Sequence, residues 1–239
     1  MLYCCQGRLR AILFCFYFLI CYTGKEISRT PKDVSCDMIS PNHMTPQTFI
    51  FFGPSGSGKG TQAKLLQEEI KKRDPERNIL YIETGQKFRE LAQGDSFTAQ
   101  EIKKVIENGG LLPEFLPIWV WTGIMIENIK GDEHIFTDGL SRQPKEAPVL
   151  DSAIRFYKRA NPMVISIEVS DEWATKLLKN RGRNDDTDEE IKKRLTWYHE
   201  NVRPAIEYFK NNDYYQFIAI DGEHTIEEVH AEILEKVGL

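Results

Sequence analysis

Short apolar runs recur along the chain from residue 48 onward, and each is separated from the next by enough residues for at least one helix. The runs are rich in Ile, Val and Phe and lack strict alternation, a pattern typical of strands that are buried on both faces. They predict five strands, at residues 48–52, 79–82, 134–137, 163–169 and 216–220. Such strands with helical crossovers favour an α/β fold of three layers, with helices on both faces of a five-stranded parallel sheet.

A glycine-rich stretch at residues 53–61 follows the first predicted strand and precedes a helix-forming run that starts at Gln62. It contains the spacing G-x-x-x-x-G-K, in which glycines let backbone N–H groups approach a phosphate closely and the lysine adds a positive charge. The candidate phosphate-binding residues are Gly56, Ser57, Gly58, Lys59, Gly60 and Thr61. Glycine rather than a hydroxyl residue follows the lysine, and the hydroxyl comes one position later.

Charged side chains follow several of the other predicted strands. Ligands of parallel sheets bind beyond the carboxyl ends of the strands, so these positions are the first candidates for a site. They are Arg89 after the second strand, Asp138 and Arg142 after the third, and Arg181, Arg183 and Arg194 after the fourth strand and its helix. The topology therefore directs positive charge and one carboxylate toward the glycine-rich stretch.

The order of these motifs resembles that of the adenylate kinases, within the nucleoside monophosphate kinase family. The family's G-x-P-x-S-G-K-G-T loop matches residues 53–61, and its T-G-D-x-x-R matches residues 84–89 with Gln86 in place of the aspartate. Its G-x-L-V-P corresponds to residues 109–113, and its D-G-F-P-R to residues 138–142, with Leu140 and Ser141 as departures. Its G-R-x-D-D and K-R-L correspond to residues 182–186 and 193–195, so the resemblance covers about residues 47–236.

The resemblance implies an enzyme that transfers a phosphoryl group reversibly from ATP to AMP, giving two ADP, with Mg²⁺ as cofactor. Lys59 and the loop amides would hold the ATP phosphates, and Arg181, Arg183 and Arg194 would join Lys59 and Arg142 around the transferring group. The acceptor nucleotide would be bound by Thr84, Arg89, Leu112, Gly139, Arg142 and Glu146. Asp138 would hold Mg²⁺ through water, with Thr61 contributing its hydroxyl.

The acceptor base is less well specified than the phosphate chemistry. Adenylate kinases have a glutamine four residues after the arginine of D-G-F-P-R, whereas this chain has Glu146. An ionised carboxylate only accepts hydrogen bonds, so it suits an edge with two donors, such as that of guanine, better than the edge of adenine. If backbone groups hold the base instead, AMP remains the acceptor, and this is the expectation, with GMP, CMP or UMP as alternatives.

Two segments are expected to border the site. An acceptor-binding segment at about residues 83–113 includes a predicted helix at 99–107, and a short lid without metal lies at about residues 179–188. Trp119 and Trp121 are expected to pack in the core or the cleft wall, and the five histidines are scattered without metal-ligand spacing.

Composition and charge limit the other classes of function. The chain has 239 residues, of which 41% are hydrophobic and 28% charged, and a net charge of −5, which argues against a broad basic surface for nucleic acid. All five cysteines precede residue 37, so the body of the chain cannot form a cysteine-rich zinc site.

We expect a cytoplasmic monomer. A nucleotide-binding protein without turnover is the alternative, although such a protein would need only the donor loop.

The first 43 residues differ from the rest. Arg8 and Arg10 precede an apolar run at residues 11–21, the outline of a secretory signal or membrane anchor. The favoured interpretation is a dispensable leader, with the translation start placed too far upstream and Met38 or Met44 as the true start; a signal or anchor and a functional appendage are the alternatives. The predicted domain organisation is a leader at 1–43 and a kinase-like domain at 44–239.

Overall fold

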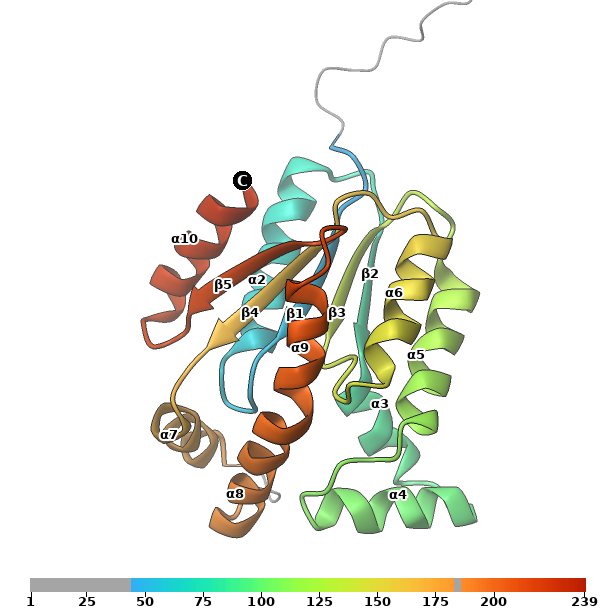
Figure 1. Cartoon of the computed structure of the whole chain (residues 1–239), viewed down its shortest axis with the longest axis vertical. Helices are drawn as coiled ribbons and strands as arrows, with labels where there is room; N and C mark the ends of the chain where they lie inside the picture. The colour runs from blue at the N-terminus through green and yellow to red at the C-terminus, as the bar shows by residue number, and fades with distance from the viewer. Residues whose placement is uncertain (1–43, 183–185) are drawn as a thin grey trace, which may run out of the picture. The chain divides into compact units, whose positions relative to one another are not determined.

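Five parallel strands form the central sheet of the computed structural model, which describes residues 44–182 and 186–239 (Figure 1). They are β1 (Thr48–Phe52), β2 (Ile79–Glu83), β3 (His134–Asp138), β4 (Met163–Glu168) and β5 (Gln216–Asp221). Their order in the sheet is β2-β3-β1-β4-β5, which confirms the predicted α/β fold. Each strand begins at the predicted residue and ends within one residue of the prediction. The predicted leader at 1–43 lies outside the described residues.

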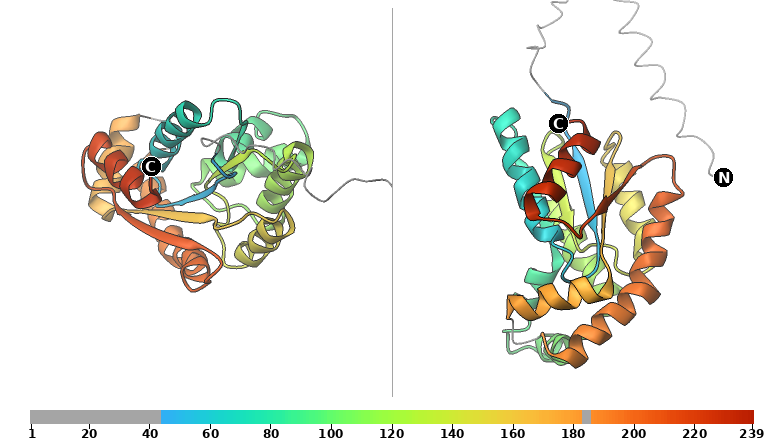
Figure 2. Two further views of the ribbon diagram at one scale, coloured as in Figure 1. Left: turned by 90° about the horizontal axis from the view of Figure 1, so that it is seen from above. Right: turned by 90° about the vertical axis from the view of Figure 1, so that its left-hand side faces the viewer.

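Helices cover both faces of the sheet (Figure 2). They are α2 (Lys59–Arg73), α3 (Thr84–Leu91), α4 (Phe97–Glu107), α5 (Phe115–Asn128), α6 (Glu146–Phe156), α7 (Asp171–Arg181), α8 (Asp188–Trp197), α9 (Arg203–Lys210) and α10 (Ile226–Val237). A π-helical turn, η1 (Tyr198–Val202), joins α8 to α9. Within residues 44–182 and 186–239, none of the helices has the length and apolar character needed to cross a membrane.

The core is divided into two layers by the alternation of side chains along β1. Phe49 and Phe51 pack with α2 and α10 on one face of the sheet, and Ile50 and Phe52 pack with α5, α6 and α9 on the other. This is the arrangement that places continuous apolar strands in the middle of three layers. The turns at the carboxyl ends of the strands are left free to build a site.

A smaller apolar cluster holds α3, α4 and α5 together. It contains Phe88, Ile102, Leu112, Leu116 and Val120, so most of the predicted acceptor-binding segment has a core of its own. Of the two neighbouring tryptophans, Trp121 is fully buried, whereas Trp119 is 63% exposed. The packing expected for Trp119 was wrong, because residues two apart on a helix point to different sides and only one of them faces the sheet.

At the opposite end of the sheet from these turns, His134 begins β3 in a fully buried position. Its Nδ1 accepts a hydrogen bond from the Gln47 amide at 3.0 Å, and its Nε2 lies 3.3 Å from Asp74 Oδ2. Because Nδ1 accepts, the proton of the neutral ring is on Nε2. Burial lowers the pKa of His134 below its usual 6.5, although the nearby Asp74 opposes this shift.

A histidine that resists protonation only when folded makes stability depend on pH. The contribution of His134 to the free energy of unfolding is present above the unfolded pKa of about 6.5 and is lost as the pH falls below it. In that range the free energy of unfolding falls by up to about 1.4 kcal/mol per pH unit. We expect the melting temperature of the wild type to fall between pH 7.5 and 5.5, and to fall less in His134→Asn, whose amide oxygen can still accept from Gln47. The exposed His199→Asn variant should follow the wild type. Equal pH dependence in all three proteins would contradict this role.

Candidate active site

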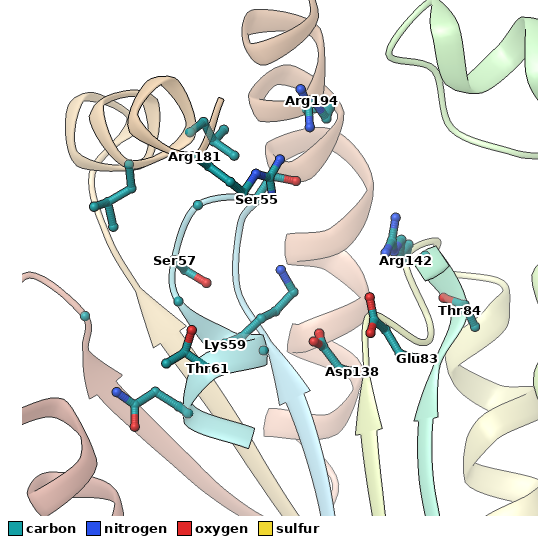
Figure 3. A pocket seen from close by; sticks show the side chains of 18 of the residues that line it. Ser55, Ser57, Lys59, Thr61, Glu83, Thr84, Asp138, Arg142, Arg181 and Arg194 are labelled. Carbon is teal, nitrogen blue, oxygen red and sulfur yellow. The ribbon is translucent and has the colours of Figure 1, made fainter. Parts of the chain in front are cut away.

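A cavity of about 690 Å³ opens at the carboxyl ends of the strands. It is lined by the loop between β1 and α2, the ends of β2 and β3, the segment after α4, and the facing ends of α7 and α8 (Figure 3). The predicted residues that line it are Gly56, Ser57, Gly58, Lys59, Gly60, Thr61, Thr84, Arg89, Leu112, Asp138, Arg142, Glu146, Arg181 and Arg194. Gly139 is buried and does not line the cavity, and Arg183 lies outside the described residues.

The glycine-rich loop is fixed by close contacts of its backbone. A Cβ at Gly56, whose φ is 86°, would lie 2.5 Å from the Ala174 carbonyl oxygen, so no larger residue fits between the loop and α7. A Cβ at Gly60 would lie 3.1 Å from Asp138 Oδ2. The glycine after Lys59 thus lets the start of α2 approach the carboxylate at the end of β3 closely. The amides at this helix start suit an anion.

Lys59 extends from the start of α2 toward the space bordered by Asp138 and Glu83 (Figure 3). Its Nζ donates to the Pro54 carbonyl oxygen at 3.3 Å. Burial lowers the pKa of Lys59, while the negative charge of Asp138 opposes the shift and Arg142 and Arg181 reinforce it. The cavity therefore concentrates positive charge around a lysine whose own solvation is reduced, an arrangement that favours a bound polyanion.

Two carboxylates lie side by side at the ends of neighbouring strands. The register of β2 and β3 pairs Glu83 with Asp138, and Tyr81 donates its hydroxyl to Asp138 Oδ2 at 3.3 Å. Burial and the negative charge of Asp138 raise the pKa of Tyr81, so the phenol stays protonated. Sequence reasoning missed Glu83 as a site residue, although it directly follows the second predicted strand. It also missed Tyr81, which no sequence signal distinguishes from other strand residues.

The carbonyl oxygen of Gly139 holds two predicted acceptor residues in place. It accepts from Arg142 Nε at 2.8 Å and from the Thr84 hydroxyl at 3.0 Å. Arg142 also lies over the ring of Trp197, 6.0 Å from its centroid. Arg89 reaches toward the same region from α3 and pairs with Glu83 Oε1 at 3.4 Å. Two arginines thus lie across the cavity from the glycine-rich loop.

The ends of α7 and α8 are joined by one carboxylate. Asp186 Oδ1 lies 2.7 Å from Arg181 Nη2 and 2.8 Å from Arg194 Nη2. Burial works against ionisation of Asp186, but the hydrogen bonds from Arg181 and Arg194 outweigh it and lower the pKa of the carboxyl. Sequence reasoning gave Asp186 no role, because spacing alone does not reveal that two arginines share it.

Glu146 is the first residue of α6 and is 1% exposed. Its Oε2 accepts from the Arg142 backbone N–H at 3.3 Å. The neighbouring Gln143 donates from Nε2 to the Leu112 carbonyl oxygen at 2.9 Å, which ties the predicted acceptor-binding segment to the start of α6. Glu146 and Leu112 both line the cavity.

Comparison with known proteins identifies the family. A family model described as adenylate kinase matches residues 51–214. The chain is 31% identical over 174 residues to the adenylate kinase of Prochlorococcus marinus, a match that covers 73% of this chain and 90% of the relative. It is 32% identical over 188 residues to the adenylate kinase of Flavobacterium johnsoniae, covering 75% and 92% of the two chains. The chain belongs to the adenylate kinase family.

Two departures from the adenylate kinase motifs have a structural explanation. Gln86, in place of aspartate, accepts from Arg89 Nη2 at 2.9 Å and from Arg89 Nε at 3.2 Å, so it holds the arginine within α3. Ser141, in place of proline, has a φ of 54°. Proline is restricted to a φ near −65°, so it could not adopt this backbone, and the loop before Arg142 follows a path of its own.

Proposed function

We propose that this chain is a nucleoside monophosphate kinase that transfers a phosphoryl group reversibly from ATP to AMP and forms two ADP. The observation that carries the proposal is the pair of cationic regions on the walls of one cavity. Lys59 and the glycine-rich loop border one side, and Arg142 and Arg89 border the other. A protein that only bound ATP would need the first region alone.

Phosphoryl transfer requires positioning and neutralisation of charge more than covalent assistance. In this proposal the loop amides and Lys59 hold the ATP phosphates, and Arg142 and Arg89 hold the phosphate of AMP. The planar guanidinium of Arg142 offers two parallel N–H groups to phosphate oxygens, while its Nε remains bonded to Gly139. The acceptor phosphate would therefore meet a cation of fixed orientation.

We also propose that residues 179–188 act as a short lid. Arg181 and Arg194 are held together by Asp186 at the mouth of the cavity. Movement of α7 and α8 as one ion-paired unit would bring both cations over the transferring phosphoryl group and exclude water.

The residues beside Lys59 fit the Mg²⁺ ion that accompanies ATP. Asp138 and Thr61 line the cavity next to the loop, and both offer the oxygen ligands that Mg²⁺ prefers. Asp138 would hold the ion through water and Thr61 would contribute its hydroxyl. When bound, the ion neutralises negative charge on the phosphates.

Replacing Asp138 with Asn tests this assignment. We expect kcat to fall about 10- to 100-fold, with a higher Mg²⁺ concentration needed for half-maximal rate, because an amide attracts metal-bound water less than a carboxylate does. Steady-state rates over a Mg²⁺ series measure both effects. The Asp213→Asn variant, changed at an exposed position away from the cavity, is the matched control. Unchanged activity and Mg²⁺ dependence in Asp138→Asn would remove Asp138 from the metal site.

The proposed function is tested with the purified chain, Mg-ATP and each of AMP, GMP, CMP and UMP as acceptor, by measuring ADP formation. ADP formation with AMP as the best acceptor is the expected result. A preference for another nucleoside monophosphate would retain the kinase and change its substrate. Tight ATP binding without ADP formation from any acceptor would favour the alternative of a non-catalytic nucleotide-binding protein.

We further propose that the enzyme works in the cytoplasm as a monomer, on free nucleotides, without nucleic acid or zinc. The net charge of −5 and the confinement of all cysteines to the first 36 residues support the last two points. The kinase domain would comprise residues 44–239, with 1–43 as a separate leader. Mass spectrometry of the native N-terminus tests that boundary.

A further inference from the structure

Glu146 brings a buried, incompletely bonded carboxyl group to the wall of the cavity. Its Oε2 accepts one hydrogen bond, from the Arg142 amide. Its Oε1 is also buried and has no hydrogen-bond partner within the described residues. Leaving a buried oxygen without a partner is unfavourable, so a ligand that bonds to it gains an interaction that the free protein lacks.

The surroundings of Glu146 suit the flat ring of a nucleobase. The cavity wall contributed by the acceptor-binding segment includes Phe88, Ile106, Leu112 and Pro117. These side chains come from α3, α4, α5 and the connection between α4 and α5. A ring held between apolar side chains would present its polar edge to the few polar groups within reach, and Glu146 is one of them.

Some of the surroundings of Glu146 favour its neutral carboxyl, and others favour the ionised carboxylate. Burial raises the pKa of Glu146 to about 7, and the repulsion from Glu114 at the start of α5 adds to this. The backbone hydrogen bond and positive charge of Arg142 oppose the shift, as does the nearby backbone of Gln143. The position at the start of α6 also favours the ionised form. Lys145, the residue before Glu146, points its charge to Glu114, 3.3 Å away.

We propose that Glu146 recognises the acceptor base as a neutral carboxylic acid, so that the choice of acceptor nucleotide depends on pH. This inference rests on the proposed function. The protonated carboxyl has one donor and one acceptor, which complement the ring nitrogen N1 and the 6-amino group of adenine. It therefore reproduces the hydrogen-bonding pattern of the glutamine amide that adenylate kinases have at this position.

Deprotonation reverses this preference. An ionised Glu146 has only acceptors, and one of them would face the lone pair of adenine N1. The same carboxylate could accept from both N1–H and the 2-amino group of guanine. AMP should thus bind better at low pH and GMP relatively better at high pH.

The expected size of the effect follows from the fraction of neutral carboxyl. With a pKa of about 7, roughly one molecule in ten is neutral at pH 8, against about nine in ten at pH 6. If only the neutral form binds AMP well, its Kd should rise about tenfold between these values. AMP binding at pH 7.5 should also be accompanied by proton uptake.

The test compares AMP binding to the wild type, Glu146→Gln and Glu207→Gln by calorimetry at pH 6, 7 and 8. Glu207 is an exposed residue of α9 that pairs with Lys210, so it provides the same chemical change away from the cavity. The AMP phosphate titrates near pH 6 in all three experiments, and only the difference between proteins is informative. We expect the tenfold rise in the wild type and Glu207→Gln, and a much flatter profile in Glu146→Gln.

Two results would overturn the proposal. One is an equal pH dependence in the wild type and Glu146→Gln. The other is the absence of proton uptake when the wild type binds AMP at pH 7.5. Proton uptake is measured by repeating the calorimetry in two buffers of different ionisation enthalpy. This measurement needs only the wild type, so it tests the proposal even if Glu146→Gln does not fold. Because arginines favour the phosphate dianion, the AMP phosphate itself would release protons and not take them up. If the wild type still forms ADP from AMP, either result rejects only the role of Glu146. If no acceptor gives ADP, the proposed kinase function itself is rejected.

Discussion

Replacing Lys59 with Met is expected to lower kcat/KM for ATP about 10³-fold. The variant keeps a side chain of similar length but removes the ammonium group beside Asp138 and Glu83. Both the donor phosphates and these two carboxylates would then lose a neutralising charge in a partly buried site, where it is worth more than in water. Steady-state kinetics with AMP held at saturation measures the loss.

The control for Lys59 is Lys72→Met on the same helix. Lys72 lies in the last turn of α2 with its side chain 74% exposed, so its replacement should leave the kinetics unchanged. A loss of less than tenfold in Lys59→Met would contradict the assigned role. Circular dichroism of both variants would separate a local effect from unfolding.

The fold could be predicted because its strands are apolar almost without interruption. β1 reads Thr-Phe-Ile-Phe-Phe, and all five residues are buried, as a central strand of a covered parallel sheet requires. The apolar pattern could not predict the exposure of Trp119, because α5 is apolar on all sides and its sequence does not show which tryptophan faces the sheet. Only the position of the sheet decides that Trp121 faces inward.

The candidate site was predictable where a backbone motif defines it. The loop at residues 53–61 and Asp138 follow directly from strand and helix boundaries. Tyr81 could not be found in this way, because it lies within a strand and reaches the cavity through the lateral pairing of β2 with β3. Asp186 likewise acquires its contacts from the folding of α7 against α8.

The proposed protonation of Glu146 could not be predicted from the sequence either, because it depends on burial in the folded chain. The carboxylate was expected to be ionised, since the ordinary pKa of glutamate is far below neutrality. Glu146 is buried at the start of α6, close to where Gln143 bonds to the Leu112 carbonyl oxygen, and no local sequence pattern reveals this burial. The consequence is a change of expectation from a mismatch with adenine to a match that depends on pH.

Arg142→Lys is expected to lower kcat about 10³-fold while the Kd for ATP stays within about threefold of the wild type. Lysine retains the positive charge but lacks the planar guanidinium of arginine. In Arg142 that group can bind phosphate through its terminal nitrogens while Nε stays bonded to the Gly139 carbonyl oxygen. The loss should therefore fall on the acceptor phosphate and the transferring group, and single-turnover rates at saturating AMP measure it. Arg73→Lys, an exposed arginine of α2 paired with Glu69, provides the same substitution outside the cavity and should be neutral. If Arg142→Lys retained more than a tenth of the wild-type rate, charge alone would suffice at this position, and the fixed orientation inferred from the Gly139 hydrogen bond would have no catalytic role.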